Sequence, residues 1–205
     1  MICPPHAIRH LVSRETQARL EQFERLVRKW SSTINLVSKS QLGALWERHI
    51  WDSAQIWPHL PAQGLHVDLG SGGGFPGIVL AIIARSEAPK MRFQLIESDA
   101  RKSVFLKTAV RELDLACDVT RSRYEDIPAL YCDSLTARAL ASLSELLEAA
   151  ERHMKPSGVA IFPKGAQWQA EVLAAEAIWA FHLTAMPSMT SGVASLLKIK
   201  DITRV

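Results

Sequence analysis

Cysteine is scarce in this chain, and long apolar runs are absent. The three cysteines, Cys3, Cys117 and Cys132, are an odd number without the spacing of metal ligands. This pattern argues against a disulfide framework and against a zinc site, so we expect no bound metal. The longest apolar run, Ile78 to Ala84, is far shorter than the roughly 20 residues that cross a bilayer.

The amino terminus and the composition are those of an ordinary globular protein. The first residues include two prolines and no continuous apolar stretch, so we expect no signal peptide and predict a cytoplasmic protein without membrane contact. With 205 residues, 48% of them hydrophobic and 22% charged, the chain suits one domain with a short extension. Its net charge of +3 and pI of about 8.9 permit a nucleic-acid partner without requiring one.

Residues 14–60 have the pattern of amphipathic helices. Apolar residues recur at helical spacing with charged residues between them: Leu20, Phe23, Val27 and Trp30. A second helical segment ends where Pro58 and Pro61 cannot continue it. We therefore predict a helical extension over residues 1–62. Its basic residues alternate with acidic ones, which favours a solvated face; a rim that binds phosphate is the sharper hypothesis.

From residue 65 onward, short apolar runs alternate with helical patterns. We predict strands over residues 65–69, 92–97, 118–121, 134–137, 159–162, 181–185 and 195–200, and helices over residues 76–85, 100–113, 143–153 and 167–179. This alternation predicts a doubly wound α/β fold, Rossmann-like, with a mostly parallel seven-stranded sheet and helices on both faces. The domain is expected to span residues 63–205 and to bind its ligand at the carboxyl ends of the strands.

A glycine-rich segment follows the first predicted strand and opens a predicted helix: VDLGSGGGFPG, residues 67–77. Glycines allow positive φ and a close approach of the backbone to a ligand. A tight turn without a ligand is the plain alternative. Several glycines beside an acidic residue, between a strand and a helix, favour a ligand-binding loop that includes Gly70, Gly72 and Gly74.

Two cofactors compete for this loop. Gly72, Gly74 and Gly77 match the fingerprint of dinucleotide binding, and Glu97 lies 20 residues beyond Gly77. Asp68, however, precedes the first glycine. A carboxylate there disfavours a pyrophosphate and favours the cationic sulfonium and amino group of S-adenosylmethionine. Glu97 is placed to accept hydrogen bonds from the ribose hydroxyls of either cofactor. We therefore predict S-adenosylmethionine.

The loop after the third predicted strand contains Tyr124 and Glu125. Such a loop would lie beside the adenine. Tyr124 could then pack on the base, while Glu125 or backbone groups bond its edge. Ordinary surface packing is the alternative for Tyr124.

Several segments, in this order and spacing, resemble the RsmG (GidB) family: DLGSGGGFPG, IESDARKSVFLK, SRYEDI, TARALASLSELLEAA and FPKG. These bacterial methyltransferases modify N7 of a guanine in small-subunit ribosomal RNA. The resemblance also reaches Asn35-Leu36-Val37, and it is made specific by Arg48-His49-Ile50-Trp51-Asp52-Ser53 and Arg138-Ala139. It implies a class I methyltransferase dependent on S-adenosylmethionine, with cofactor contacts at Gly70, Phe75, Tyr124, Glu125 and Arg138. The GGGF run departs from the family's loop, which puts the cofactor fit there in question.

The chemistry is narrowed by what is missing. Enzymes that methylate an exocyclic amine usually carry a [DNS]-P-P-[FYW] turn after the fourth strand, where this chain has Thr136-Ala137-Arg138-Ala139. Pyrimidine C5 chemistry needs a cysteine nucleophile, but Cys117 and Cys132 would lie at the wrong ends of their strands and are expected to be small buried residues. Guanine N7 has a lone pair in the ring plane and no proton. We therefore expect catalysis by positioning, without a dedicated acid or base.

Arg138 and Lys164 are the candidates for positioning guanine and phosphate. The structural alternatives are an ion pair of Arg138 with Glu125 or Asp68, and a solvated Lys164.

Contacts with RNA are predicted for Arg48, His49 and Lys164, although helical periodicity favours a core position for His49. Trp51 is a candidate for stacking on a base. The predicted partner is 16S ribosomal RNA, either naked or within the assembled small subunit, and a monomer suffices.

Two other functions remain open. A small-molecule methyltransferase would share every cofactor residue but would turn over without RNA and show no salt-sensitive RNA binding. An NAD-dependent oxidoreductase would need a hydride-transfer partner, and the sequence has no Tyr-x-x-x-Lys pair to serve one.

Overall fold

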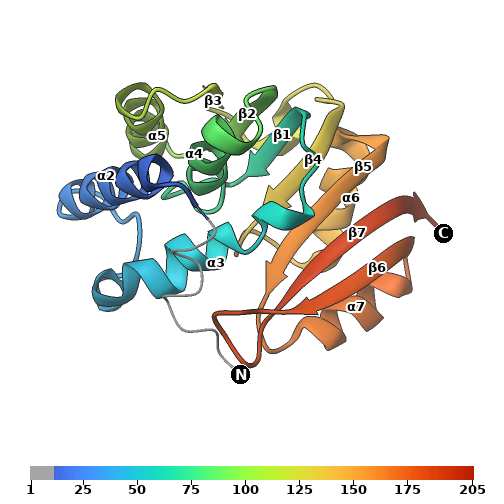
Figure 1. Ribbon diagram of the computed structural model, residues 1–205. Helices are drawn as coiled ribbons and strands as arrows, with labels where there is room; N and C mark the ends of the chain where they lie inside the picture. Colours follow the sequence, from blue (N-terminus) through green and yellow to red (C-terminus); the bar gives the residue numbers. More distant parts are fainter. Residues whose placement is uncertain (1–11) are drawn as a thin grey trace.

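The computed structural model describes residues 12–205, which form a seven-stranded sheet of order β3-β2-β1-β4-β5-β7-β6 (Figure 1). The strands are β1 (Gly64–Leu69), β2 (Met91–Ile96), β3 (Cys117–Thr120), β4 (Cys132–Ala137), β5 (Met154–Lys164), β6 (Trp179–Pro187) and β7 (Ser195–Arg204). Strands β1 to β5 pair in parallel, and β7 runs antiparallel between β5 and β6. The predicted doubly wound sheet is confirmed. Cys3 and the start of the predicted extension lie outside the described residues.

The strand order reverses at β1, which pairs with β2 on one side and β4 on the other. In open α/β sheets a ligand binds above the carboxyl ends of the strands at this reversal. The glycine loop follows β1, Glu97 follows β2, and Arg138 follows β4. The topology therefore brings these three predicted site elements to one edge of the sheet.

Helices cover both faces of the sheet (Figure 1). One face carries α2 (Arg14–Ser31), α4 (Gly77–Glu87) and α5 (Ala100–Glu112), and the other carries α6 (Leu143–His153) and α7 (Trp168–Glu176). Side-chain caps fix two of the helix starts. Ser13 accepts from the N–H of Thr16 at α2, and Ser142 and Glu145 form a capping box at α6.

The apolar run from Ile78 to Ala84 forms the centre of α4 and is buried along its whole length. The sheet covers one side of α4, while α2 and the short helix α3 (Trp51–Ala54) cover the other. A helix that is apolar all round is stable only inside such a core. No helix within residues 12–205 has the length and apolar character needed to span a membrane.

The segment between α2 and β1 consists of short helical turns. They are the 3₁₀ turns Lys39–Ala44 and Trp57–His59, the π turn Trp46–Ile50, and α3. Trp51 is only 3% exposed, and its ring packs on that of Trp46 with centroids 4.9 Å apart. The ring is therefore not available to stack on a base, so that hypothesis was wrong.

Several element boundaries differ from the prediction, and two of them have a clear physical reason. Trp179, expected to end a helix, begins β6, because α7 ends at Glu176 and the indole is buried in the apolar cluster beneath α6 and α7. Strand β5 begins at Met154, before the predicted residue 159. Its first residues pair with β4 across a register shift that the local pattern did not show.

Candidate active site

The glycine loop turns sharply over the carboxyl ends of β1 and β2. Gly70, Gly72 and Gly74 have positive φ angles of 63°, 54° and 84°, which disfavour any side chain. A Cβ at Gly70 would also lie 2.6 Å from the Leu140 side chain. Positive φ is thus the shared reason that these positions favour glycine, and at Gly74 a Cβ would also lie 2.7 Å from the Ile78 side chain.

Asp68 lies beneath this loop in a buried chain of hydrogen bonds. The Thr136 hydroxyl donates to Oδ1 of Asp68 at 2.7 Å, and the N–H of Gly77 donates to Oδ2 at 3.2 Å. Since that hydroxyl donates to Asp68, it accepts from Nε2 of His66 at 3.1 Å. Nδ1 of His66 then accepts from the Ser134 hydroxyl at 2.8 Å. We call Ser134, His66, Thr136 and Asp68 the loop-supporting cluster.

Burial sets the charge state of this cluster. It lowers the pKa of His66 to about 3, so the imidazole is neutral near pH 7. It also raises the pKa of Asp68 to about 6, although hydrogen bonds from Thr136, Ser71 and Gly77 act in the opposite direction. Asp68 is 1% exposed. The sequence argument placed the Asp68 carboxylate beside the sulfonium. In the structure this carboxylate is buried, and it supports the loop from below.

Glu97 holds the glycine loop from the side. Its Oε2 accepts from the N–H of Gly72 at 2.8 Å, and its Oε1 accepts from the N–H of Asp99 at 2.7 Å. A carboxylate has about four acceptor positions, so both oxygens can accept further bonds. The predicted contact of Glu97 with ribose hydroxyls fits this position and stays a prediction.

A cavity of about 760 Å³ opens beside the loop. Its walls come from residues 36–52, residues 70–75 of the loop, Lys102 on α5, residues 138–139 after β4 and residues 190–194 before β7. The volume lies within the range of about 300–1,000 Å³ that is typical of small-molecule sites. The closely packed glycine backbone and the size of the cavity both fit S-adenosylmethionine.

Arg138 stands in the wall of this cavity and is held from several directions. Its Nη1 lies 3.3 Å from Oδ2 of Asp52 and 3.3 Å from the carbonyl oxygen of Arg48. Its Nη2 donates to Nδ1 of His49 at 2.8 Å. The guanidinium also lies over the ring of Phe75, 5.4 Å from the centroid. Its orientation is therefore fixed before any ligand binds.

Asp52 is the ion-pair partner of Arg138, in place of the predicted alternatives Glu125 and Asp68. Its other oxygen, Oδ1, accepts from the Thr190 hydroxyl at 2.6 Å. Thr190 belongs to the loop between β6 and β7, so this carboxylate links the amino-terminal segment, the end of β4 and that loop. We call Arg138, Asp52, His49 and Thr190 the cavity cluster.

His49 is a neutral support for Arg138. Because a guanidinium only donates, Nδ1 of His49 accepts, and Nε2 therefore carries the proton and donates to Oε1 of Gln41 at 3.2 Å. Burial and the charges of Arg138 and Arg48 lower the pKa of His49 to about 4. A neutral imidazole that is 7% exposed does not suit the predicted RNA contact. Arg48, by contrast, is exposed beside the cavity.

A smaller cavity of about 400 Å³ adjoins the first one above the ends of β4 and β5. The two cavities share Asp52, Arg138, Ala139 and Ala194. Nζ of Lys164 donates to the carbonyl oxygen of Ala141 at 2.8 Å and pairs with Oε2 of Glu171 at 2.7 Å. The Lys164 side chain is 10% exposed, so the alternative of a solvated lysine was wrong.

Tyr124 and Glu125 lie in the 3₁₀ turn Tyr124–Asp126 and line neither of these two cavities. The carbonyl oxygen of Tyr124 accepts from Nε2 of His153 at 3.0 Å. Burial and the neighbouring Glu125 raise the pKa of Tyr124. The half-buried ring packs against the core. The contacts of both residues with adenine stay predictions.

Cys117 begins β3 and Cys132 begins β4, so both lie at the edge of the sheet opposite the glycine loop. Burial raises the pKa of the Cys132 thiol to about 12 and also raises that of Cys117. Thiols of this kind are not nucleophiles at neutral pH.

Comparison of this sequence with known proteins shows the family to which the chain belongs. The chain matches the model of rRNA small subunit methyltransferase G (GidB) over residues 16–198. It is 52% identical to the ribosomal RNA small subunit methyltransferase G of Ruegeria pomeroyi and 46% identical to that of Cereibacter sphaeroides, with 95% of each chain covered. The chain belongs to this family.

Solved structures agree on the fold. A SAM-dependent methyltransferase from Aquifex aeolicus has a TM-score of 0.60, with 14% identity over 86% of this chain and 97% of that chain. TYW2 of M. jannaschii, in complex with AdoMet, has a TM-score of 0.58, with 13% identity over 77% and 76%. The predicted family is thus confirmed, and with it the enzyme class, a methyltransferase that uses S-adenosylmethionine.

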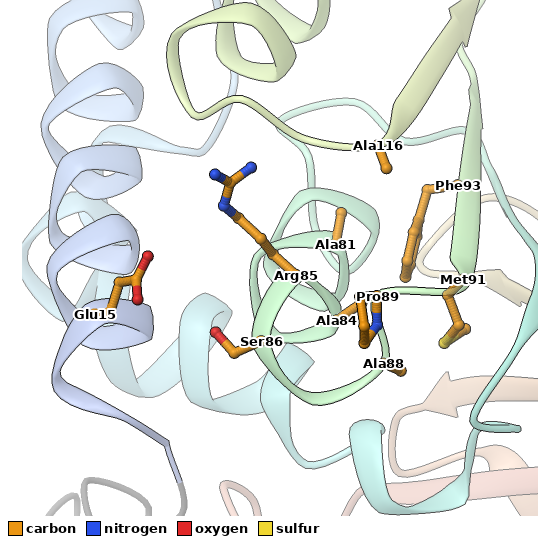
Figure 2. Close-up of a pocket in the computed structure, with 10 residues that line it drawn as sticks. All are labelled: Glu15, Ala81, Ala84, Arg85, Ser86, Ala88, Pro89, Met91, Phe93 and Ala116. Carbon is orange, nitrogen blue, oxygen red and sulfur yellow. The ribbon is translucent and has the colours of Figure 1, made fainter.

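Another cavity, of about 600 Å³, is lined by none of the residues that border the two cavities above (Figure 2). Small residues of α4 line it together with Arg85, and Met91 and Phe93 contribute from the start of β2. These are the amino ends of parallel strands, whereas α/β sheets bind ligands at the carboxyl ends. We therefore assign this cavity no part in the transfer.

Several parts of the methyltransferase site escaped the sequence reasoning. The role of Asp52 could have been predicted from its spacing, because it lies three residues after His49 and so on the same side of a helical turn. Gln41 and Thr190 have no such spacing. They reach the cavity only because the turn Lys39–Ala44 and the β6–β7 loop fold back over the sheet.

Proposed function

We propose that this enzyme transfers a methyl group from S-adenosylmethionine to N7 of a specific guanine in 16S ribosomal RNA. The observation that carries the proposal is the pair of adjoining cavities at the carboxyl edge of the sheet, with Arg138 in the wall of both. The cavity beside the glycine loop suits the cofactor, and the other suits a base. The names of the relatives support small-subunit ribosomal RNA as the substrate.

The cofactor contacts are assigned by position. The backbone of Gly70, Gly72 and Gly74 borders the cofactor, and Phe75 closes the loop behind it. Glu97 binds the ribose, Tyr124 and Glu125 hold the adenine, and Asp68 acts from below by fixing the loop. Support for the last role comes from its hydrogen bond to the N–H of Gly77, where α4 begins.

The chemistry needs positioning and little else. When bound, S-adenosylmethionine supplies the methyl group: the lone pair of N7 forms the new bond while the electrons of the carbon–sulfur bond return to sulfur. Guanine N7 has no proton to lose, so the chain supplies no general base. Arg138, already fixed by Asp52 and His49, holds the base or its phosphate with little loss of freedom on binding.

RNA contacts are assigned to exposed and cavity-lining cations. Arg48 lies on the rim of the first cavity, and Lys164 lines the second. We place Arg48 in a helical extension, residues 1–62, that packs on a methyltransferase domain, residues 63–205. The enzyme acts as a monomer in the cytoplasm, on naked RNA or on the assembled small subunit.

Labelling with tritiated S-adenosylmethionine tests the function. Purified enzyme is incubated with small subunits from a strain that lacks the corresponding gene, or with RNA extracted from them, and the label is mapped by cleavage at 7-methylguanosine. Label at one guanine, and none in wild-type subunits, is the expected result. The two substrate forms separate naked RNA from the assembled particle. Calorimetric binding of the cofactor without any label in RNA would contradict the proposal and point to a small-molecule substrate.

A further inference from the structure

The smaller cavity carries a carboxylate, that of Glu171, which has no part in the contacts assigned above to the cofactor and the RNA. Glu171, on the first turn of α7, lines this cavity, and its side chain is 31% exposed. Its Oε2 accepts from the N–H of Leu143 at 3.0 Å and from Nζ of Lys164 at 2.7 Å. These bonds use one of the two oxygens. The carboxylate therefore keeps acceptor capacity for a ligand.

Lys164 places a donor next to this acceptor. An ammonium group has three N–H bonds, and those to Ala141 and Glu171 use two of them. The third can donate to a ligand in the same cavity. The wall thus presents an acceptor and a donor side by side, bordered by apolar surface from Pro163, Ala139 and Leu196.

Guanine presents the complementary pattern along its Watson–Crick edge. The N2 amino group and N1–H are donors, and O6 beside them is an acceptor. Adenine would instead turn a ring acceptor toward the carboxylate, which opposes binding. N7 lies on the other edge of the base. Recognition through the Watson–Crick edge therefore leaves the lone pair of N7 free to react.

We propose that the smaller cavity receives the target guanine, flipped out of its RNA context, and that Glu171 selects it by accepting hydrogen bonds from N1–H and N2–H while Lys164 donates to O6. The volume of about 400 Å³ suffices for one base. This inference rests on the proposed function. It adds a substrate-binding site and a specificity residue to that function.

In the same position, Glu171 also contributes to the rate of methyl transfer. The purine becomes positively charged as N7 gains the methyl group. A carboxylate bonded to N1–H and N2–H interacts more strongly with that charged ring than with neutral guanine. Loss of Glu171 therefore lowers kcat as well as the affinity for the subunit.

A cycle between the enzyme and the base tests the contact. Small subunits are reconstituted with 16S ribosomal RNA that carries guanine or inosine at the target position, since inosine lacks the N2 amino group. For the wild-type enzyme, kcat/KM with inosine is expected to be about 10- to 100-fold lower. For Glu171→Gln, kcat/KM with guanine falls, and the inosine penalty shrinks to about threefold or less.

Controls separate this contact from a general loss of structure. Glu176→Gln changes an exposed carboxylate on the same helix and is expected to keep the wild-type penalty. Calorimetric affinity for S-adenosylmethionine should stay unchanged in every variant, because Glu171 does not line the larger cavity. If Glu171→Gln fails to fold, Glu171→Asp takes its place in the test, because it keeps the charge but shortens the reach of the side chain.

The outcomes distinguish the two levels of the argument. An inosine penalty that stays at the wild-type value in the Glu171 variant would overturn the role of Glu171 while leaving the proposed function intact. Failure of the wild-type enzyme to label guanine-containing subunits would overturn the proposed function, and the guanine cavity with it.

Discussion

Two polar clusters support the site, one between β1 and β4 and the other above the carboxyl ends of the strands, and each contains an aspartate, a histidine and a threonine. The loop-supporting cluster completes this set with Ser134, and the cavity cluster completes it with Arg138. The first cluster is closed off under the glycine loop. The second stands in the wall of a cavity. Similar side chains thus fix a backbone shape in one place and a positive charge in the other.

The two histidines show how the surroundings divide these tasks. Both are neutral near pH 7, but for different reasons. Burial alone lowers the pKa of His66, whereas burial together with Arg138 and Arg48 lowers that of His49. His66 therefore contributes to the stability of the fold. His49 takes part in holding the charge that faces the ligand.

Arg138→Ala should have the largest effect, because it removes the charge of the cavity cluster. We expect kcat/KM with small subunits to fall about 100-fold or more. The melting temperature should also fall, by about 2–6 °C, because Asp52 and His49 lose a partly buried partner while the loop-supporting cluster stays intact. Activity assays and thermal unfolding measure the two effects. Arg111→Ala, at an exposed position in the last turn of α5, is the control and should leave kcat/KM near the wild-type value.

Asp68→Ala tests the other cluster. The Thr136 hydroxyl and the N–H of Gly77 then lose their buried acceptor, which should lower the free energy of unfolding by about 1–3 kcal/mol. The affinity for S-adenosylmethionine should fall as the loop loosens. Urea unfolding and calorimetry measure these changes. Asp68→Asn keeps the volume and one acceptor and should lose less. Unchanged stability in the alanine variant would break the comparison between the clusters.

His49→Gln sharpens the comparison through pH. The pKa of His49 is about 4 in the folded protein and 6.5 in an exposed histidine, so the unfolded chain takes up the proton first as the pH falls. This contribution to stability is complete above pH 6.5 and is lost as the pH falls toward 4. The variant should therefore lose stability less steeply over this window, by roughly 1 kcal/mol per pH unit. Urea unfolding at several pH values measures the slope, and an equal slope in the variant and the wild-type protein would contradict the prediction.

The sheet and the glycine loop could be predicted from the sequence because both have local patterns. Strand and helix periods alternate along the chain, and in the loop Gly70, Gly72 and Gly74 stand where φ is positive. The pairing of His66 with Ser134 and of Asp68 with Thr136 depends on the register between β1 and β4, which no local pattern states. This is why Asp68, which the sequence argument took for a ligand contact, is found buried beside Thr136. Thr190 lies 138 residues from the carboxylate that it contacts, and only the folded chain brings them together.

Thr190→Val should have the smallest effect, and it asks whether the β6–β7 loop belongs to the cavity cluster. The substitution keeps the shape but removes the hydroxyl that donates to Asp52 at 2.6 Å. Asp52 still pairs with Arg138, so kcat/KM with small subunits should fall only about two- to tenfold. Thr184→Val, at an exposed position on β6, is the matched control. Equal activity in the two variants would confine the cluster to Arg138, Asp52 and His49. A loss confined to Thr190→Val, with normal affinity for S-adenosylmethionine, would extend the substrate side of the site to this loop.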